Sequence, residues 1–192
     1  MLFYVTIALV AAVFSAANGS DETCPLYGTM ACADHLTGKD ILRFDNKPLA
    51  ENEENLEKQC EDTLPYVKCV VDFGSRCPNY MDNIYYQTFK DQYSTCLLIC
   101  DKNNGFRRSF LESARCLNEQ NEHRGDKCGD IPRFPGSLKD FTQEFCLTVK
   151  DYIQCSIEEI EEKCGSEVLM VAKEIISFNF SSLKHGCNKL QL

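Results

Sequence analysis

The chain has 192 residues, of which 44% are hydrophobic and 26% are charged, and this balance excludes an intrinsically disordered protein. The net charge of −9 argues against nucleic acid or an anionic membrane as a partner, because both partners are themselves negatively charged. The length corresponds to one domain or to two small ones.

Residues 1–19 predict a secretory signal peptide. They contain an apolar run from Leu2 to Phe14, followed by the small residues that signal peptidase requires. The run is shorter than the roughly 20 residues that span a bilayer, and no second long apolar run follows. We therefore expect a secreted, extracellular protein without a membrane span, in which residues 20–192 form a Cys-rich domain.

Thirteen cysteines follow the predicted signal peptide, roughly one residue in thirteen of the remaining chain. In a secreted protein this density indicates a disulfide scaffold before it indicates metal ligands. Because thirteen is odd, at least one thiol is unpaired, and it could link two copies of the chain in a disulfide-bonded dimer. The disulfide candidates are Cys24, Cys32, Cys60, Cys69, Cys77, Cys96, Cys100, Cys116, Cys128, Cys146, Cys155, Cys164 and Cys187.

The hydrophobic period is helical throughout, and no segment shows the sustained alternation of a strand. The acidic stretch 51–61 is expected to be helical, and Pro65 either kinks that helix or opens the next one. Apolar residues at helical spacing predict a second helix over 85–100, which Asn103-Asn104-Gly105 ends, and a shorter helix over 106–117.

The segment 118–135 is rich in Gly, Pro, Asn and Asp and predicts a long loop. After it, Ser137 and Asp140 offer a capping box for a helix that ends at Cys164-Gly165. A last helix is predicted around residues 168–176. The sequence thus predicts an all-α, disulfide-stapled assembly of five to six helices.

Two cysteine triplets indicate an internal repeat. The first comprises Cys60, Cys69 and Cys77, and the second comprises Cys146, Cys155 and Cys164, with seven or eight residues between neighbours. In both triplets a tyrosine, Tyr66 or Tyr152, stands three residues before the middle cysteine. We predict two related halves, about 20–120 and 121–192, with coincidence in a Cys-rich chain as the alternative.

The spacing of the second triplet restricts its disulfide partners. Nine residues of helix rise about 13.5 Å, whereas a disulfide needs Cα atoms within roughly 7 Å. If the three cysteines share one helix, they must link it to different neighbours. Cys96 and Cys100 lie one helical turn apart, so either both reach a facing helix or one of them is the unpaired thiol.

This cysteine order resembles that of the Cys-rich domain of unknown function in secreted nematode proteins and related arthropod proteins, including insect hemolymph glycoproteins. The resemblance covers nearly the whole chain after residue 19. It implies an all-helical extracellular protein, and it implies no activity, cofactor or catalytic residue. The matching elements are the early pair Cys24 and Cys32, the first triplet, Cys96-x-x-x-Cys100, Cys116-Leu117, Cys128 and the second triplet with Gly165.

The tripeptide Arg124-Gly125-Asp126 lies in the predicted loop, between Cys116 and Cys128. In an integrin ligand, such an Asp completes a metal site of the receptor and the Arg pairs with acidic groups. Nearby disulfides reduce the cost of ordering the loop, and the arrangement looks like that of disintegrins. The alternative is a solvated turn, for which Gly and Asp are ordinary residues.

Other motifs are weaker. Asn179-Phe180-Ser181 is a candidate glycosylation site, unless the neighbouring phenylalanines bury it. The acidic clusters at 51–62 and 158–162 have the character of solvated helix faces rather than of a calcium site. The three histidines are scattered, so we expect no metal site, and no catalytic motif is present. The abundant aromatic residues form either a packed core or an apolar pocket.

Taken together, the sequence predicts a non-enzymatic extracellular binding or structural protein of an invertebrate secretion such as hemolymph, venom or saliva. Its partner would be an extracellular protein or an apolar ligand, and no cofactor is expected. The first alternative is an integrin-binding effector that acts through Arg124-Gly125-Asp126. The second is a carrier of a hydrophobic small molecule, which would require a closed apolar cavity.

Overall fold

The computed structural model describes residues 29, 31–32, 48–77, 83–122, 127–130, 132 and 141–188. These residues form an all-α structure without strands, as the sequence predicts. Its elements are α2 (Glu53–Ser75), α4 (Ile84–Cys100), α5 (Gly105–Glu122), α6 (Gln143–Cys164), the short 3₁₀ helix η4 (Ser166–Val168) and α7 (Leu169–Asn188). Within the described ranges, no helix combines the length and the apolar character that crossing a membrane requires.

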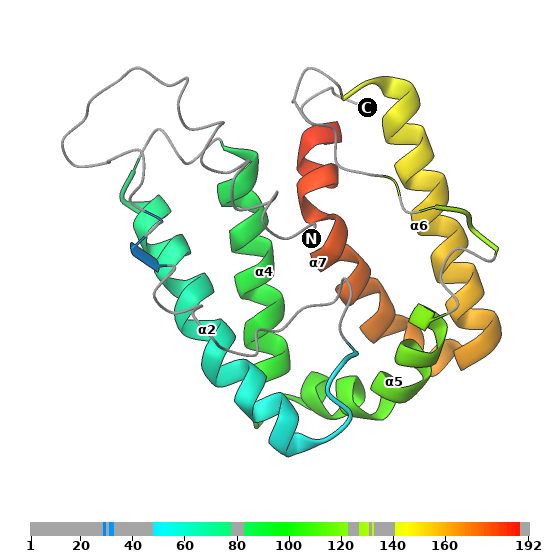
Figure 1. The fold of residues 1–192 in the computed structure, drawn as a ribbon, viewed down its shortest axis with the longest axis horizontal. Helices are drawn as coiled ribbons and strands as arrows, with labels where there is room; N and C mark the ends of the chain where they lie inside the picture. The colour runs from blue at the N-terminus through cyan, green and yellow to red at the C-terminus, as the bar shows by residue number, and fades with distance from the viewer. Residues whose placement is uncertain are drawn as a thin grey trace.

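Four long helices stand side by side in the order α2, α4, α7 and α6, and α5 lies across one end of α4, α7 and α6 (Figure 1). Helix α4 packs on both α2 and α7, so the centre of the row joins elements that are far apart in the sequence. Helix α5 contacts α4, α6 and α7. The crossing helix therefore closes the end of the row.

Helix α2 runs unbroken through Pro65, so the prediction that this proline opens a new helix is wrong. The Asn52 side chain caps the start by accepting a hydrogen bond from the Asn55 N–H at 2.9 Å, and Glu53 and Glu54 lie in the first turn, where the helix dipole favours them. Its buried residues recur at steps of three and four and face α4. They are Leu56, Cys60, Thr63, Val67, Val70 and Gly74.

Helix α6 begins later than predicted. Thr142 is its N-cap and accepts a hydrogen bond from the Phe145 N–H at 3.1 Å, whereas Ser137 and Asp140 lie outside the described residues. Phe141 consequently stands before the helix, and its ring packs against the backbone of Gly186 on α7. The predicted end at Cys164-Gly165 is confirmed, and Gly165 has a φ of +85°.

The predicted loop 118–135 begins too early, because α5 continues to Glu122. Asn118 lies on α5, where its side chain hydrogen-bonds the backbone of Leu49. Such tertiary contacts stabilise a helix beyond the range in which its apolar pattern is visible. Helix α7 likewise continues to Asn188, well past the predicted segment.

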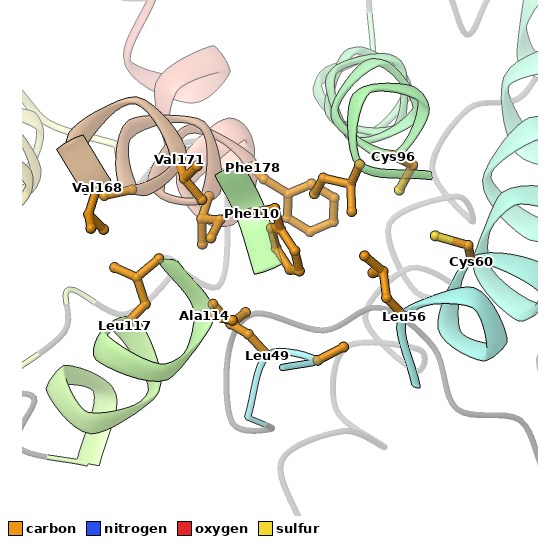
Figure 2. Packing of buried hydrophobic residues seen from close by; sticks show 14 residues of the cluster. Leu49, Leu56, Cys60, Cys96, Phe110, Ala114, Leu117, Val168, Val171 and Phe178 are labelled. Carbon is orange, nitrogen blue, oxygen red and sulfur yellow. The ribbon is translucent and has the colours of Figure 1, made fainter. Parts of the chain in front are cut away.

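The main core lies where α5 crosses the other helices, and Phe110 is at its centre (Figure 2). Leu56 of α2, Ile99 of α4, Phe110 of α5 and Val171 of α7 are all fully buried. Because each comes from a different helix, both predicted halves contribute to one core. A second cluster fills the space between α6 and α7, and it contains Phe141, Val149, Tyr152, Ile176, Phe180 and Leu183.

Every described α-helix contains at least one disulfide-bonded cysteine. The pairs are Cys32–Cys69, Cys60–Cys100, Cys116–Cys164, Cys128–Cys155 and Cys146–Cys187, with Cα separations of 5.6–5.9 Å. Cys77 is also disulfide-bonded, and Cys24 lies outside the described residues. The three cysteines of α6 bond to α7, to the segment 127–130 and to α5, which confirms that they link their helix to different neighbours.

The pairing scheme repeats along the chain. The first cysteine of each triplet bonds to the end of the partner helix, over separations of 40 residues for Cys60 and 41 residues for Cys146. The middle cysteines, Cys69 and Cys155, each bond to a cysteine upstream of their own helix. An internal duplication would produce this scheme. The third cysteine of the second triplet, Cys164, bonds to Cys116 on α5, so this disulfide links the two predicted halves.

Among the cysteines that the structure describes, the unpaired thiol is Cys96, one of the alternatives that its spacing to Cys100 left open. Its side chain has no exposed surface, and burial raises its pKa to about 12. An intermolecular disulfide through Cys96 would require α4 to separate from the core. The folded structure therefore argues against the covalent dimer that the odd cysteine suggested.

Candidate functional site

A groove with a cavity volume of about 70 Å³ lies between α5, α6 and α7. Leu117, Tyr152 and Ile176 form part of its apolar surface, and Asn121 and Asn179 bring amide groups to it. The groove thus combines the two features that binding sites share, an apolar wall and a few polar groups.

The segment before α2 contributes one residue, Leu49, to the lining of this groove. Leu49 lines it and is held there by Asn118 of α5, whose Oδ1 accepts a hydrogen bond from the Leu49 N–H at 2.6 Å. The Asn118 Nδ2 donates to the Leu49 carbonyl at 3.1 Å and to Glu51 at 2.8 Å. The amide of Asn118 therefore pairs with both backbone polar groups of Leu49.

The volume of the groove limits what it can bind. Pockets for drug-sized ligands are about 300–1,000 Å³, whereas about 70 Å³ holds a few water molecules or one small side chain. The main core around Phe110 is tightly packed, since its largest side chains are fully buried. This geometry fits contact with a single side chain of a partner better than transport of a lipid.

The glycosylation candidate Asn179 lies on α7 and lines this groove, with its side chain half-buried. The flanking Phe178 and Phe180 are buried, which is the condition under which Asn179 was expected to stay unglycosylated. Ser181 of the same motif is fully buried, and its hydroxyl donates to Asp91 at 2.7 Å. A glycan on Asn179 would therefore have to leave through the groove.

A polar seam joins α4 to α7. The Asp91 carboxylate oxygen Oδ2 accepts from Ser181 and contacts His185 Nε2 at 2.8 Å, while Thr95 donates to Glu174 at 2.5 Å. Although serine, histidine and aspartate meet here, the aspartate lies between the other two. Ser181 thus lacks the histidine base that a catalytic triad requires, and the cluster acts as a link between helices.

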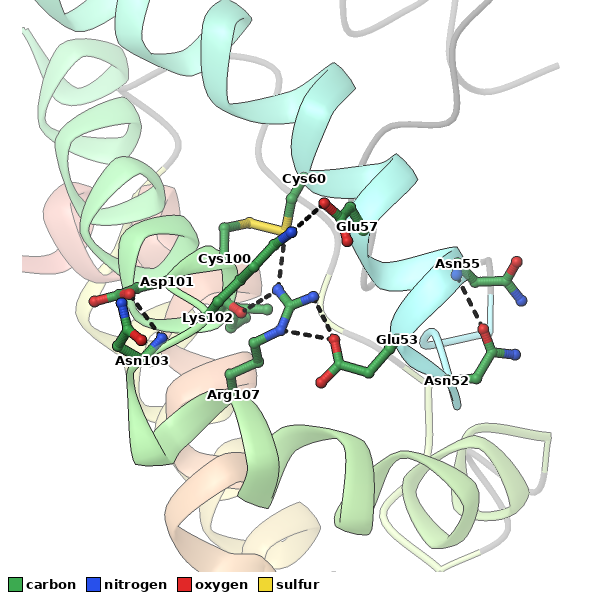
Figure 3. Close-up of polar contacts among 11 residues, drawn as sticks. Asn52, Glu53, Asn55, Glu57, Cys60, Cys100, Asp101, Lys102, Asn103 and Arg107 are labelled. Atoms are coloured by element: carbon green, nitrogen blue, oxygen red, sulfur yellow. Dashed lines mark hydrogen bonds and ion pairs between the residues drawn. A yellow bond between two sulfur atoms is a disulfide. The ribbon is translucent and has the colours of Figure 1, made fainter.

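A buried arginine joins α2, α4 and α5 (Figure 3). Arg107 is only 3% exposed and donates two hydrogen bonds to Glu53, at 2.6 and 2.9 Å, and one to the Ile99 carbonyl at 3.2 Å. Its Nη1 also lies 4.0 Å from the Cys60 sulfur of the Cys60–Cys100 disulfide. Nearby, Lys102 hydrogen-bonds Glu57 and lowers the pKa of that carboxyl.

The role of Arg107 was not predicted from the amino-acid sequence. A signal was present, because Arg107 lies three residues before Phe110 and thus on the predicted apolar face of its helix. A charged residue on such a face needs a buried partner. The partner, Glu53, is 54 residues away, and no local pattern could have identified it.

Arg124, Gly125 and Asp126 lie outside the described residues, but both of their flanks are described. Upstream, α5 ends at Glu122 and is tied to α6 by Cys116–Cys164. Downstream, Cys128 bonds to Cys155 of α6. Lys127 donates to Glu162 of the same helix at 2.6 Å, a contact that raises the pKa of Lys127. The described segments on either side of residues 123–126 are therefore each linked to α6.

The remaining candidates are placed as follows. His35 and His123 lie outside the described residues, and His185 belongs to the α4–α7 seam. Among the residues that the structure describes, no three His, Cys, Asp or Glu side chains come together in a way that could hold a metal ion. Members of the acidic cluster at 51–62 bind Arg107, Lys102 and Asn118 rather than each other.

Comparison of the chain with models of protein families, with curated proteins and with solved structures finds no match.

Proposed function

We propose that the protein is a secreted, non-enzymatic extracellular binding protein. The observation that carries this proposal is the disulfide framework, which bonds each described α-helix to another part of the chain. Such bonds persist in oxidising compartments and are rare in the cytosol. The predicted signal peptide and the resemblance to secreted nematode and arthropod proteins support the same assignment. The burial of Cys96 favours binding over covalent assembly.

Expression of the full chain in eukaryotic cells tests this proposal. We expect the protein in the medium, with a new N-terminus after Ala17 or Gly19 and with two hydrogens lost for each disulfide, as measured by intact mass and N-terminal sequencing. A chain that stays in the cells and retains residues 1–19 would contradict the proposal. Covalent multimers on a non-reducing gel would favour a structural role instead.

A second candidate function is integrin binding through Arg124-Gly125-Asp126. The anchoring of both flanks on α6 favours it, because a segment with fixed ends loses less entropy when it binds. Asp126→Glu should abolish adhesion of integrin-bearing cells to the immobilised protein while leaving the helical circular dichroism unchanged. Asp130→Glu, at a nearby exposed position, is the matched control. Adhesion that survives Asp126→Glu would eliminate this function.

Transport of a hydrophobic small molecule is less well supported, because the groove is smaller than such a ligand requires. Native mass spectrometry of the secreted protein decides between the alternatives. An additional small-molecule mass would revive the carrier hypothesis, and a bare monomer would support recognition through the surface.

A further inference from the structure

The disulfides differ in the charge beside them. The Arg107 guanidinium lies 4.0 Å from the Cys60 sulfur, in a buried environment where a charge acts strongly. In contrast, the Glu159 carboxylate lies 3.5 Å from the Cys128 sulfur of Cys128–Cys155. A cation stabilises a thiolate that leaves a disulfide, and an anion disfavours it.

The two cysteines of the Cys60–Cys100 disulfide differ in burial and in the charge beside them. Cys60 is 6% exposed and lies beside Arg107, while Cys100, at the end of α4, is only partly buried. A thiolate attacks one sulfur in line with the bond and expels the other. Attack on the Cys100 sulfur, which belongs to the less buried residue of the pair, therefore makes Cys60 the leaving group beside the guanidinium (Figure 3).

We propose that Cys100 is a site of thiol–disulfide exchange, at which an external thiol forms a mixed disulfide while Cys60 leaves beside Arg107. The bond between the two cysteines breaks and its electron pair goes to the Cys60 sulfur, which later takes a proton from water. A second external thiolate then releases Cys100 as a thiol, and the two external thiols become one disulfide. The external thiol is a low-molecular-weight thiol or a protein dithiol.

The internal thiol Cys96 does not perform this attack. It has no exposed surface, and a disulfide between Cys96 and Cys100 would join two positions one turn apart on the same helix, which strains the bond geometry. The attacking thiol must therefore come from outside the protein. Cleavage would release α2 from the end of α4 and leave the other disulfides closed.

The proposal is tested by exposing the native protein to reduced glutathione, quenching with N-ethylmaleimide at intervals and mapping the peptides by mass spectrometry. We expect Cys60 to be alkylated first and glutathione to be attached to Cys100. Glutathione on Cys60, prior opening of another disulfide, or simultaneous opening of all of them would overturn the proposal.

Two variants separate the electrostatic effect from simple exposure. Arg107→Met should slow the opening of Cys60–Cys100 about tenfold, because it removes the cation from the leaving sulfur. Glu53→Gln should accelerate the opening roughly threefold, because it removes the anion that neutralises Arg107. Glu53 is 67% exposed, so this variant keeps the test decisive if Arg107→Met does not fold.

Glu159→Gln is the matched control. It should accelerate the opening of Cys128–Cys155 and leave the rate for Cys60–Cys100 unchanged. If Glu53→Gln leaves the Cys60–Cys100 rate unchanged, Arg107 does not assist the leaving sulfur and the proposal fails.

Discussion

Asn118 on α5 holds the backbone of Leu49 with both ends of its amide, as acceptor at 2.6 Å and as donor at 3.1 Å. These contacts fix the segment before α2 against α5 and α6, although no described disulfide joins α2 or α4 to those helices. The two covalently linked groups of helices therefore depend on non-covalent contacts such as this one.

Asn118→Ala should consequently destabilise the protein by about 2–3 kcal/mol, since three hydrogen bonds are lost and the Leu49 backbone loses both of its Asn118 partners. Asn121→Ala, on the same helix, is the control and should cost less than about 1 kcal/mol. Urea unfolding monitored by circular dichroism measures both values. Equal losses of unfolding free energy in the two variants would show that the Leu49 contact does not stabilise the protein more than the Asn121 side chain does.

Gly186 on α7 is needed because Phe141 packs directly against it. A Cβ at this position would lie 2.2 Å from a ring carbon of Phe141, so Gly186→Ala must displace the ring and should cost about 1–3 kcal/mol. Gly105→Ala is the control, because a Cβ there meets no atom within 4 Å and alanine favours the helix. Thermal unfolding should therefore show a lower Tm for the first variant and an unchanged or higher Tm for the second.

Cys96 should be inert in the folded protein. Its thiol has no exposed surface, so Ellman's reagent should detect no free thiol under native conditions and one thiol in denaturant. Cys96→Ala should abolish the signal in denaturant. Rapid reaction of the native protein would mean that α4 opens far more readily than its packing indicates.

The same thiol should make stability decrease at alkaline pH. The pKa of Cys96 is about 12 in the folded protein against an ordinary value of 9.0, so between these values the unfolded state ionises while the folded state keeps its proton. Loss of protons on unfolding lowers the free energy of unfolding as pH rises. Between pH 8 and pH 10.5, the urea midpoint of the native sequence should fall further than that of Cys96→Ala. Parallel decreases would exclude Cys96 as the cause.

Several features were predictable from the sequence because they depend on local physics. The helical period placed α4 and most of α6, and the glycine after Cys164 marked the end of α6 correctly. The nine-residue spacing of Cys146, Cys155 and Cys164 was sufficient to exclude bonds among them, since helix rise and disulfide reach are fixed quantities. The one-turn spacing of Cys96 and Cys100 argued against a bond between them and left open that one of them is the unpaired thiol.

Other features were decided by the tertiary structure. The helix boundaries at Thr142 and Glu122 depend on a cap and on packing that a periodic pattern does not contain. The disulfide partners, the Arg107–Glu53 pair and the Asp91–Ser181–His185 seam join residues between 27 and 94 positions apart. The amino-acid sequence thus determined the helices, which follow from neighbouring residues, and the number of cysteines that can form disulfides. Only the packing of the helices against one another decided which cysteines meet, which one stays free and which sulfur faces a buried cation.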